Sequence, residues 1–325
     1  MNTNMNTNMN TNMNTNSLIV STAMADALDV IGDRWSLLVL RDVFLGVRRF
    51  EQLRQKTGAS RATLTRRLES FVANDILYKC LYSSTGKRFE YRLTEKGLGL
   101  FSASLLSWQW ECVWVEHADN FLPKRLFHVA CDHELTPVAI CQHCQYPIEI
   151  SDVEWPDLSQ YLDSQFQEMT KKGKQRRVRS SVKSGLEDLS LTHVSSLIGD
   201  RWSLLLIIAS FLGVDRYDAF QKQLGIASNI LTGRLNLLVE VDVLKRFSYQ
   251  ENPPRNEYRL TEKGKSLFPL VMVMRQWAID WVLKNNTVEV LTHKRCNQPL
   301  VIDVQCQHCE QKPWPRDVQF QHADS

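Results

Sequence analysis

The sequence predicts a mainly α-helical fold with small β-hairpins, built twice along the chain. The main observation is a repeat, because Ile31–Leu38 and Ile198–Leu205 both read IGDRWSLL, 167 residues apart. Glu90–Gly97 and Glu257–Gly264 both read EYRLTEKG at the same offset. Two distant matches at one offset indicate a module of roughly a hundred residues that occurs twice. A chain of 325 residues has room for two such modules.

Composition excludes several classes of protein. The sequence has no long apolar run, so we expect no transmembrane helix. It does not begin with a basic region followed by an apolar one, so we expect no secretory signal. Six of the eight cysteines lie in two repeated clusters, which favours metal or redox chemistry in a reducing compartment. The net charge of +3 is too small to indicate a partner.

The repeat and the local composition divide the chain into six segments. We expect a disordered low-complexity tail at 1–17, a first helical module at 18–118, a Cys-rich tail at 119–150, a linker at 151–189, a second helical module at 190–285 and a second Cys-rich tail at 286–325. The linker contains a basic run, Lys171–Arg179. This run is either a solvated linker or an arm that follows phosphates or a minor groove.

Helix caps and alternation predict the elements of the first module. Asp33, Ser60 and Thr94 are expected to cap helices at their N-termini, and Gly46 and Gly58 to end them. The expected helices are 35–44, 49–56 and 61–74, followed by strands at 76–82 and 88–93 and a long helix at 96–114. The strands and the basic turn between them form a hairpin directly after the third helix.

The third helix separates apolar residues from small and basic ones. At 100° per residue, one face carries Leu64, Leu68, Phe71 and Val72. The opposite face carries Ala62, Thr63, Arg66, Glu69 and Ser70, with Thr65 and Arg67 on the flanks and Arg61 at the exposed start. Small side chains allow close approach to a DNA groove, and arginine recognises guanine edges. The order of helices, hairpin and long helix is that of a winged helix-turn-helix domain.

The module resembles the HxlR-type transcriptional regulators. The resemblance rests on Trp35, Arg49-Phe50, Gly58–Ser60, Leu64-Thr65, Arg67-Leu68 and Glu90–Gly97, and in the second module on Trp202, Arg216-Tyr217, Gly225–Ala227, Leu231-Thr232, Arg234-Leu235 and Glu257–Gly264. Members of this family are typically homodimeric DNA-binding repressors or activators with one domain per chain. The resemblance therefore implies two tandem winged helix-turn-helix domains that act as a pseudo-dimer within one chain. It leaves open whether the chain also forms a higher homo-oligomer.

We therefore expect a cytoplasmic, nucleoid-associated regulator that binds double-stranded DNA in a sequence-specific way. Arg61, Thr63, Thr65 and Arg66 are expected at base edges or phosphates, and Arg67, Lys87 and Arg88 on the DNA backbone. The full set of candidate residues is Arg49, Ser60, Arg61, Thr63, Thr65, Arg66, Arg67, Lys87, Arg88, Ser228, Asn229, Thr232, Arg234 and Arg255. No nucleophile, acid–base pair or phosphate loop is evident, so we do not expect an enzyme.

The two modules differ in charge. Residues 48–92 hold eleven basic and four acidic side chains, whereas residues 215–259 hold seven and six. Arg61 is replaced by Ser228 and Arg66 by Gly233. We therefore expect the first module to supply most of the DNA affinity. The alternative is a protein-interaction scaffold that has kept the winged folds but reads DNA weakly or not at all.

Each module is followed by a repeated cluster of cysteines and histidines. His128, Cys131, Cys141 and Cys144 have the same spacing pattern as His293, Cys296, Cys306 and Cys309. Zinc prefers four tetrahedral Cys or His ligands, so we expect one structural zinc ion in each zinc-ribbon-like tail. Thiol-based redox sensing and cysteines without a ligand are the alternatives. Cys80 and Cys112 have no counterparts and are expected in the core.

Two pairs of tryptophans recur at the same offset in the long helices. They are Trp110 with Trp114, and Trp277 with Trp281. We expect these side chains to pack between the two long helices. The alternative is an aromatic pocket for a small-molecule effector, whose identity the sequence does not indicate.

Overall fold

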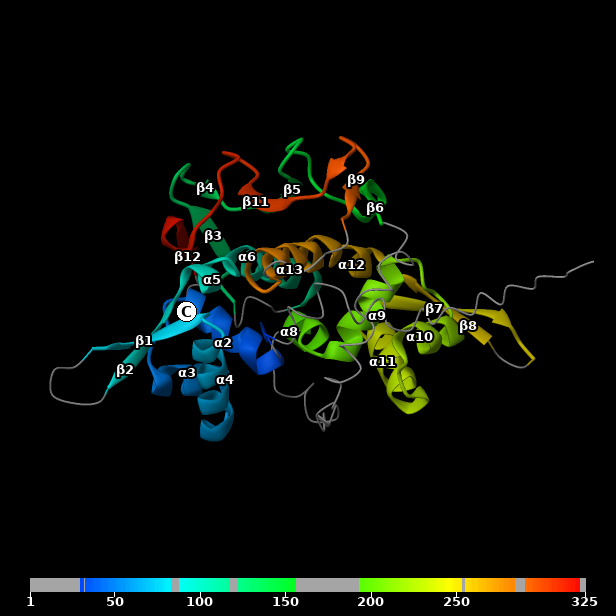
Figure 1. Ribbon diagram of the computed structural model, residues 1–325, viewed down its shortest axis with the longest axis horizontal. Helices are drawn as coiled ribbons and strands as arrows, with labels where there is room; N and C mark the ends of the chain where they lie inside the picture. The colour runs from blue at the N-terminus through cyan, green and yellow to red at the C-terminus, as the bar shows by residue number, and fades with distance from the viewer. Residues whose placement is uncertain are drawn as a thin grey trace, which may run out of the picture.

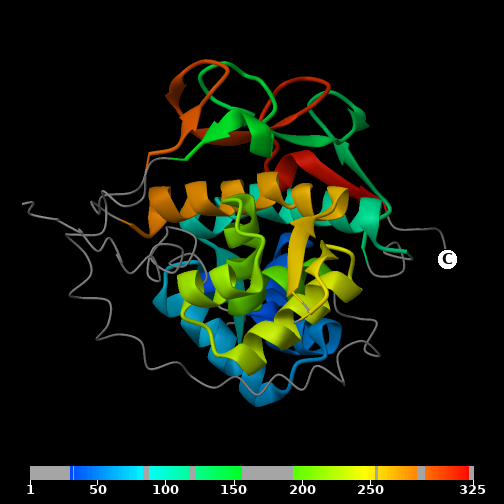
Figure 2. The ribbon, with the colours of Figure 1, turned by 90° about the vertical axis from the view of Figure 1, so that its right-hand side faces the viewer.

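The computed structural model describes residues 30–31, 33–82, 88–116, 122–155, 193–252, 255–283 and 290–321. The elements form three layers, with two helix-turn-helix units at the bottom, long helices in the middle and the Cys-rich tails on top (Figure 1, Figure 2). The low-complexity tail and the basic run of the linker lie outside the described residues. None of the helices in the described ranges is long and apolar enough to span a membrane.

The first copy contains the first three helices and the hairpin that its sequence predicts. They are α2 (Arg34–Phe44), α3 (Phe50–Thr57), α4 (Arg61–Ala73), β1 (Leu77–Leu81) and β2 (Phe89–Leu93). Asp33 caps α2 by accepting hydrogen bonds from the backbone N–H groups of Trp35 and Ser36 at 3.0 and 3.1 Å. Gly58 ends α3 with a φ of 66°, a left-handed conformation that favours glycine. The local caps therefore fix these boundaries.

The second copy repeats this order of elements. It comprises α8 (His193–Ile198), α9 (Arg201–Phe211), α10 (Tyr217–Leu224), α11 (Ser228–Glu240), β7 (Leu244–Gln250) and β8 (Arg255–Leu260). In each copy the two strands pair antiparallel as the expected hairpin. The two hairpins extend from opposite ends of the molecule, and α4 and α11 lie on the face away from the tails (Figure 1).

The predicted single long helix is wrong, because each copy divides it in two. The segments are α5 (Glu95–Leu98) and α6 (Phe101–Trp114), then α12 (Glu262–Lys265) and α13 (Phe268–Trp281). The break tightens the chain, since the N–H of Leu100 bonds to the carbonyl of Gly97 at 3.1 Å, three residues back. Gly97 lies so close to the chain just before β1 that a Cβ there would sit 2.2 Å from the carbonyl oxygen of Ile76. The first turn is therefore held against the hairpin before α6 begins.

The long helices α6 and α13 join the two copies through reciprocal tryptophans. The indole N–H of Trp110 donates to the carbonyl of Lys263 at 3.3 Å, and that of Trp277 donates to the carbonyl of Lys96 at 2.9 Å. Both rings are buried, which confirms that they pack between the copies. Trp114, at the end of α6, is 36% exposed and does not share that burial.

The Cys-rich tails are intertwined, because strands of one tail pair with strands of the other. The pairs are β3 (Arg125–His128) with β12 (Val318–Gln321), β5 (Pro137–Cys141) with β11 (Ile302–Cys306), and β6 (Val153–Glu154) with β9 (Thr292–His293). Two further short strands, β4 (His133–Glu134) and β10 (Gln298–Pro299), complete the sheets. The tails therefore form one shared layer above α6 and α13 (Figure 2).

The core follows the helical faces that the sequence indicates, with one exception among the cysteines. Leu64, Leu68 and Phe71 of α4 are fully buried. The prediction that Cys112 belongs to the core is wrong, because this side chain is exposed, and Cys80 is only half-buried. Cys80 lies in a two-stranded hairpin, which shields one face of a strand from solvent at most.

Candidate nucleic-acid interface and metal clusters

The start of α4 presents a capped, polar surface. Ser60 is the N-cap, and its hydroxyl accepts a hydrogen bond from the backbone N–H of Thr63 at 3.2 Å. The Ser60 hydroxyl also donates to the Thr63 hydroxyl at 3.0 Å. The backbone N–H groups at a helix start attract anions, so this end of α4 suits a phosphate. Ser60 and Thr63 thus lie where the sequence placed them, with Ser60 exposed and Thr63 half-buried.

Two arginines of α4 point into solvent. Arg61 is exposed and forms an ion pair with Glu51 of α3, with its guanidinium 5.2 Å from the ring centre of Phe50. Hydrogen bonds from Arg54 and then Arg61 hold the pKa of Glu51 below its ordinary value. An exposed pair of this kind contributes little to stability, so Arg61 can exchange Glu51 for a phosphate at small cost. Arg66 is exposed one turn further along α4, beside the half-buried Thr65.

Arg67 differs from its neighbour Arg66 in its contacts. Its guanidinium forms an ion pair with Asp33, the residue that caps α2. The Arg67 side chain is only 23% exposed. This half-buried pair ties α4 to the start of α2. The expected contact of Arg67 with the DNA backbone stays a prediction.

The hairpin of the first copy carries exposed basic groups. Arg88 is exposed immediately before β2, and Lys87 lies outside the described residues. Arg49 is exposed at the start of α3, with its guanidinium 4.5 Å from the ring centre of Tyr82. An isolated backbone bridge between Arg49 and Glu90 joins this region to the hairpin. Arg49 and Arg88 are thus both available on the outer surface of the first copy.

The second copy presents a less basic surface. Ser228 and Asn229 are exposed at the start of α11, and Arg255 is exposed at the start of β8. The Ser228 hydroxyl accepts a hydrogen bond from the side-chain amide of Gln221 at 2.7 Å. The Thr232 hydroxyl is hydrogen-bonded to the Tyr217 hydroxyl at 3.0 Å. Both hydroxyls therefore already have protein partners.

Arg234 repeats the arrangement of Arg67, and its expected DNA contact likewise stays a prediction. Its Nε lies 2.8 Å from an Asp200 carboxylate oxygen, and its side chain is 14% exposed. Asp200 caps α9 by accepting from the N–H of Ser203 at 2.9 Å. The arginine–aspartate pair thus joins α4 to the start of α2 in the first copy and α11 to the start of α9 in the second.

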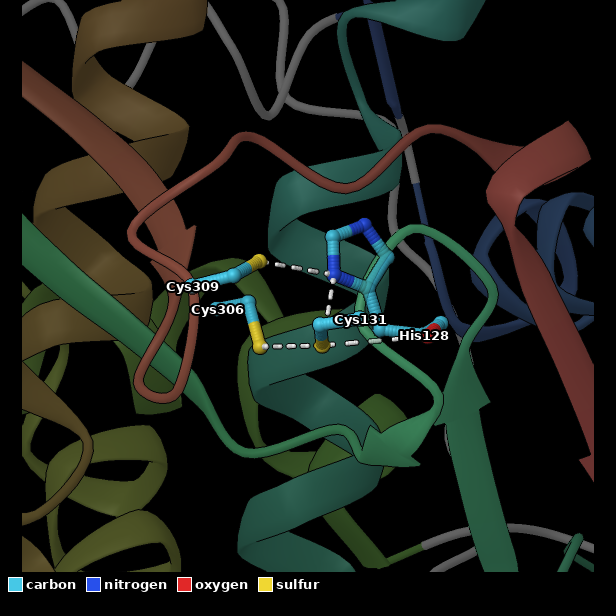
Figure 3. Close-up of side chains that lie close together, drawn as sticks. All are labelled: His128, Cys131, Cys306 and Cys309. Carbon is cyan, nitrogen blue, oxygen red and sulfur yellow. Dashed lines mark hydrogen bonds between the residues drawn. The ribbon is translucent and has the colours of Figure 1, made fainter.

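A first cluster of possible metal ligands is shared between the tails. It consists of His128 and Cys131 from the first tail and Cys306 and Cys309 from the second (Figure 3). The Nδ1 atom of His128 lies 3.2 Å from the Cys309 sulfur and 3.6 Å from the Cys131 sulfur. The sulfurs of Cys131 and Cys306 are 4.0 Å apart. The four atoms face a common centre.

A second cluster mirrors the first. It consists of Cys141 and Cys144 from the first tail and His293 and Cys296 from the second. The Nδ1 atom of His293 lies 3.3 Å from each of the Cys144 and Cys296 sulfurs. The sulfurs of Cys141 and Cys296 are 3.9 Å apart. All eight residues that the spacing singled out thus gather in two groups of four.

The expectation that each tail holds its own cluster is wrong. Each group combines the histidine–cysteine pair of one tail with the CxxC pair of the other. The reason is the pairing of β5 with β11, which sets Cys141 opposite Ile302 and Cys306 opposite Pro137. This register carries each CxxC pair toward the partner tail. The sequence spacing is the same for both groupings and does not distinguish them.

The geometry of both clusters fits a tetrahedral zinc ion. Bonds of about 2.3 Å to sulfur and 2.0 to 2.1 Å to nitrogen imply sulfur–sulfur distances of roughly 3.8 Å and nitrogen–sulfur distances of roughly 3.6 Å. The closest spacings, 3.2 to 4.0 Å, lie around these values, and all ligand atoms of each cluster lie within 4.8 Å of one another. Three cysteines and one histidine form a closed set of four ligands, as in structural zinc sites.

Comparison with known proteins identifies the repeated module. The family described as HxlR-like helix-turn-helix matches residues 30–119 and again residues 197–286. The uncharacterized HTH-type transcriptional regulator Mb3122 of Mycobacterium bovis is 40% identical over 133 residues, covering 39% of this chain and 80% of the relative. The uncharacterized HTH-type transcriptional regulator YvaP of Bacillus subtilis is 32% identical over 87 residues, covering 26% and 81%.

Solved structures are also similar to part of this chain. The crystal structure of PA1607 is 34% identical, with a TM-score of 0.36, and the match covers 40% of this chain and 94% of PA1607. The crystal structure of diamide-treated YodB from B. subtilis is 31% identical, with a TM-score of 0.24 and coverage of 26% and 86%.

Proposed function

Because this chain belongs to the HxlR-like helix-turn-helix family, we propose that it regulates transcription by binding double-stranded DNA in a sequence-specific way. The observation that carries the proposal is the exposed, basic and capped face of α4, with Arg61 and Arg66 directed into solvent. A recognition helix needs small polar side chains for close approach and arginines for base edges and phosphates.

The two copies act as one intramolecular pair of DNA readers. The reciprocal bonds of Trp110 and Trp277 and the shared sheets of the tails support this arrangement. The helices α4 and α11 lie on the same face of the molecule, with the hairpins at its two ends (Figure 1). Paired helix-turn-helix units generally read half-sites about 34–36 Å apart along the duplex. One chain would thus do what two chains do in a homodimer.

The proposed interface of the first copy comprises Arg49, Ser60, Arg61, Thr63, Thr65, Arg66 and Arg88, with Lys87 beside them in the sequence. In the second copy it comprises Ser228, Asn229 and Arg255, with Thr232 at its edge. Arg67 and Arg234 are left out, because each is committed to an aspartate that caps a neighbouring helix. The interface is therefore more basic in the first copy than in the second.

The first copy supplies most of the affinity. Arg61 and Arg66 have Ser228 and Gly233 as their counterparts, so the second helix has two fewer cations to meet phosphates. Asn229 remains exposed there and can recognise adenine. Each lost phosphate contact lowers the slope of log affinity against log salt by about 0.9. The second copy thus contributes more to the position of the protein along the DNA duplex than to its DNA affinity.

Two structural zinc ions stabilise the shared tails. The three cysteines and one histidine of each cluster would hold one ion, and each ion would link the first tail to the second. Zinc bound in this way supplies folding free energy and no catalytic position, because all four ligands come from the protein. The two ions would thus fix the arrangement of the two DNA-reading units.

A mobility shift on random duplex DNA at several salt concentrations tests the DNA-binding proposal. A regulator of this kind binds random DNA weakly, and the binding weakens steeply as salt rises. A protein-interaction scaffold with the same folds would not bind even at low salt. That result would overturn the proposal.

A further inference from the structure

A third group of possible metal ligands lies beside the first cluster, and it also joins the two tails. It consists of Cys131 and His133 from the first tail and His308 from the second. The ligand atoms of these residues lie within 4.8 Å of one another. Cys131 is half-buried and both histidines are exposed. The group therefore faces solvent, whereas His128 of the first cluster is buried.

The two histidine rings are stacked on each other. Their centres are 3.4 Å apart, and their planes differ by 17°. The Nδ1 atom of His133 lies 2.5 Å from the backbone carbonyl oxygen of Cys131. A carbonyl can only accept, so Nδ1 carries the proton of the neutral ring and Nε2 keeps its lone pair for a metal ion. Metal-binding histidines commonly make a hydrogen bond of this kind through their other nitrogen.

The three side chains have the ligand types that zinc prefers, which are imidazole nitrogen and thiolate sulfur. A thiolate sulfur has more than one lone pair, so Cys131 can bridge an ion in the first cluster and a second ion beside it. Ligand atoms around zinc lie roughly 3.5 Å apart, so the group has to contract by about 1 Å at most. The stacked rings also have to turn apart, so that both nitrogens point at one ion. Exposed side chains are free to make these rotations.

The second cluster has no such neighbouring group among the described residues. His143 is the counterpart of His308, because each is the third residue of a CQHC sequence. Gln298, however, stands where the first tail has His133. The two positions are equivalent in the structure, since each pairs across short strands with the histidine of its own tail. The chain thus contains a natural comparison, with glutamine in place of one histidine.

We propose that Cys131, His133 and His308 bind a third zinc ion, which exchanges with zinc in solution. Three protein ligands leave one coordination position for water. An ion at this exposed site is held less tightly than an ion enclosed by four protein ligands. Its occupancy would therefore follow the supply of free zinc, and each binding event would add a link between the two tails. The inference rests on the proposed zinc clusters only through the shared ligand Cys131.

Equilibrium dialysis of the reduced full chain, followed by elemental analysis, tests the proposal. Protein dialysed without zinc should hold the two enclosed ions, and protein dialysed against micromolar zinc should hold one ion more. His133→Gln gives the first tail the residue of the second and should remove the additional ion. His143→Gln changes an exposed histidine of the second cluster, so it is the matched control and should keep that ion.

The reverse substitution tests whether the site can be built in the second tail. Gln298→His places an imidazole at the position equivalent to His133, near His143 and Cys296. This variant should bind one zinc ion more than the wild type in micromolar zinc. A purely structural role of His133 would predict no such gain, so its absence would contradict the proposal.

Cobalt(II) added to the protein with its two enclosed zinc ions tests the role of Cys131. Cobalt bound to a thiolate absorbs in the near ultraviolet by charge transfer from sulfur, whereas cobalt bound to imidazoles alone does not. The wild type should show this absorption and His133→Gln should not. Equal absorption in both proteins would show that cobalt had entered the enclosed clusters instead. Bound cobalt without the absorption would exclude Cys131 as a ligand.

Two further results would overturn the proposal. They are the same zinc content with and without micromolar zinc, and an additional ion that His133→Gln retains. The dialysis separates this inference from the proposed clusters. Two tightly held ions without a third would refute the third site alone. A third ion that depends on His133, in protein without tightly held ions, would refute the enclosed clusters alone.

Discussion

The sulfurs of Cys131 and Cys306 lie 4.0 Å apart, although 175 residues separate them in the chain. Cys131 belongs to the tail of the first copy and Cys306 to that of the second. A metal ion between them would therefore join the two halves of the molecule. Experiments can therefore test two things: whether metal is present, and whether each metal site combines residues of both tails.

Pairs of cysteine substitutions distinguish the shared clusters from separate ones. Cys131→Ser with Cys306→Ser removes two ligands of one shared cluster, so the protein should keep one of two zinc ions. Cys131→Ser with Cys141→Ser removes one ligand from each cluster, and both ions should be lost or weakly held. Elemental analysis of the reduced, purified protein measures this. Separate tail clusters would give the reverse pattern, and absence of metal from the wild type would refute the zinc proposal.

Gly233 offers a substitution that should improve the second recognition helix. A Cβ at this position would meet no atom within 4 Å, so a side chain fits without strain. Gly233→Ala and Gly233→Arg should each raise the free energy of unfolding by about 1 kcal/mol, because glycine weakens a helix interior. Only Gly233→Arg should also raise DNA affinity and steepen its salt dependence. Equal DNA affinity of the two variants would show that this face does not approach phosphates.

Neighbouring arginines of α4 should separate DNA binding from stability. Arg66→Ala removes an exposed side chain and should weaken DNA binding while changing the free energy of unfolding by less than about 0.5 kcal/mol. Arg67→Ala leaves Asp33 without its half-buried partner and should lower the free energy of unfolding by about 1–2 kcal/mol. Urea unfolding and DNA titration measure the two effects. If Arg66→Ala lowered the free energy of unfolding and Arg67→Ala did not, the assignment of Arg66 to DNA binding and Arg67 to stability would be contradicted.

Glu111 should make the stability of the protein depend on pH. Its pKa is about 7 in the folded protein and 4.5 as the ordinary value, so the folded state holds a proton that the unfolded state has lost. Stability should therefore fall as pH rises from about 4.5 to 7, by about 3 kcal/mol at most. Glu111→Gln should lose this component. Urea unfolding at pH 5 and pH 8 measures it, and an identical pH dependence in both proteins would contradict the account.

Local signals in the sequence predicted most of the helix boundaries. Asp33 and Ser60 cap helices through bonds within three residues, and Gly58 has the left-handed conformation that ends α3. Such signals depend on short stretches of chain, so they can be read without knowing the tertiary structure. The break before α6 was not predicted, because it depends on the contact between Gly97 and the carbonyl of Ile76.

The site could be predicted less fully, because its remaining features depend on distant residues. The eight candidate ligands were found from spacing, but their exchange between tails depends on the register of β5 and β11. Comparison of the copies could have revealed that Arg67 pairs with Asp33. The second copy keeps an arginine at this position, Arg234, although it has lost the counterparts of Arg61 and Arg66.

The slope of log affinity against log salt tests the central claim, that one chain reads DNA through two unequal copies. The measurement uses a duplex selected from a random pool, with wild type, Arg66→Ala and Asn229→Ala. Arg66→Ala should lower affinity about tenfold or more and reduce the slope by about 0.9. Asn229→Ala should lower affinity less and leave the slope unchanged, because asparagine carries no charge. An equal loss of DNA affinity in Arg66→Ala and Asn229→Ala would contradict the account. So would DNA binding by the wild type that does not depend on salt, or no binding at all.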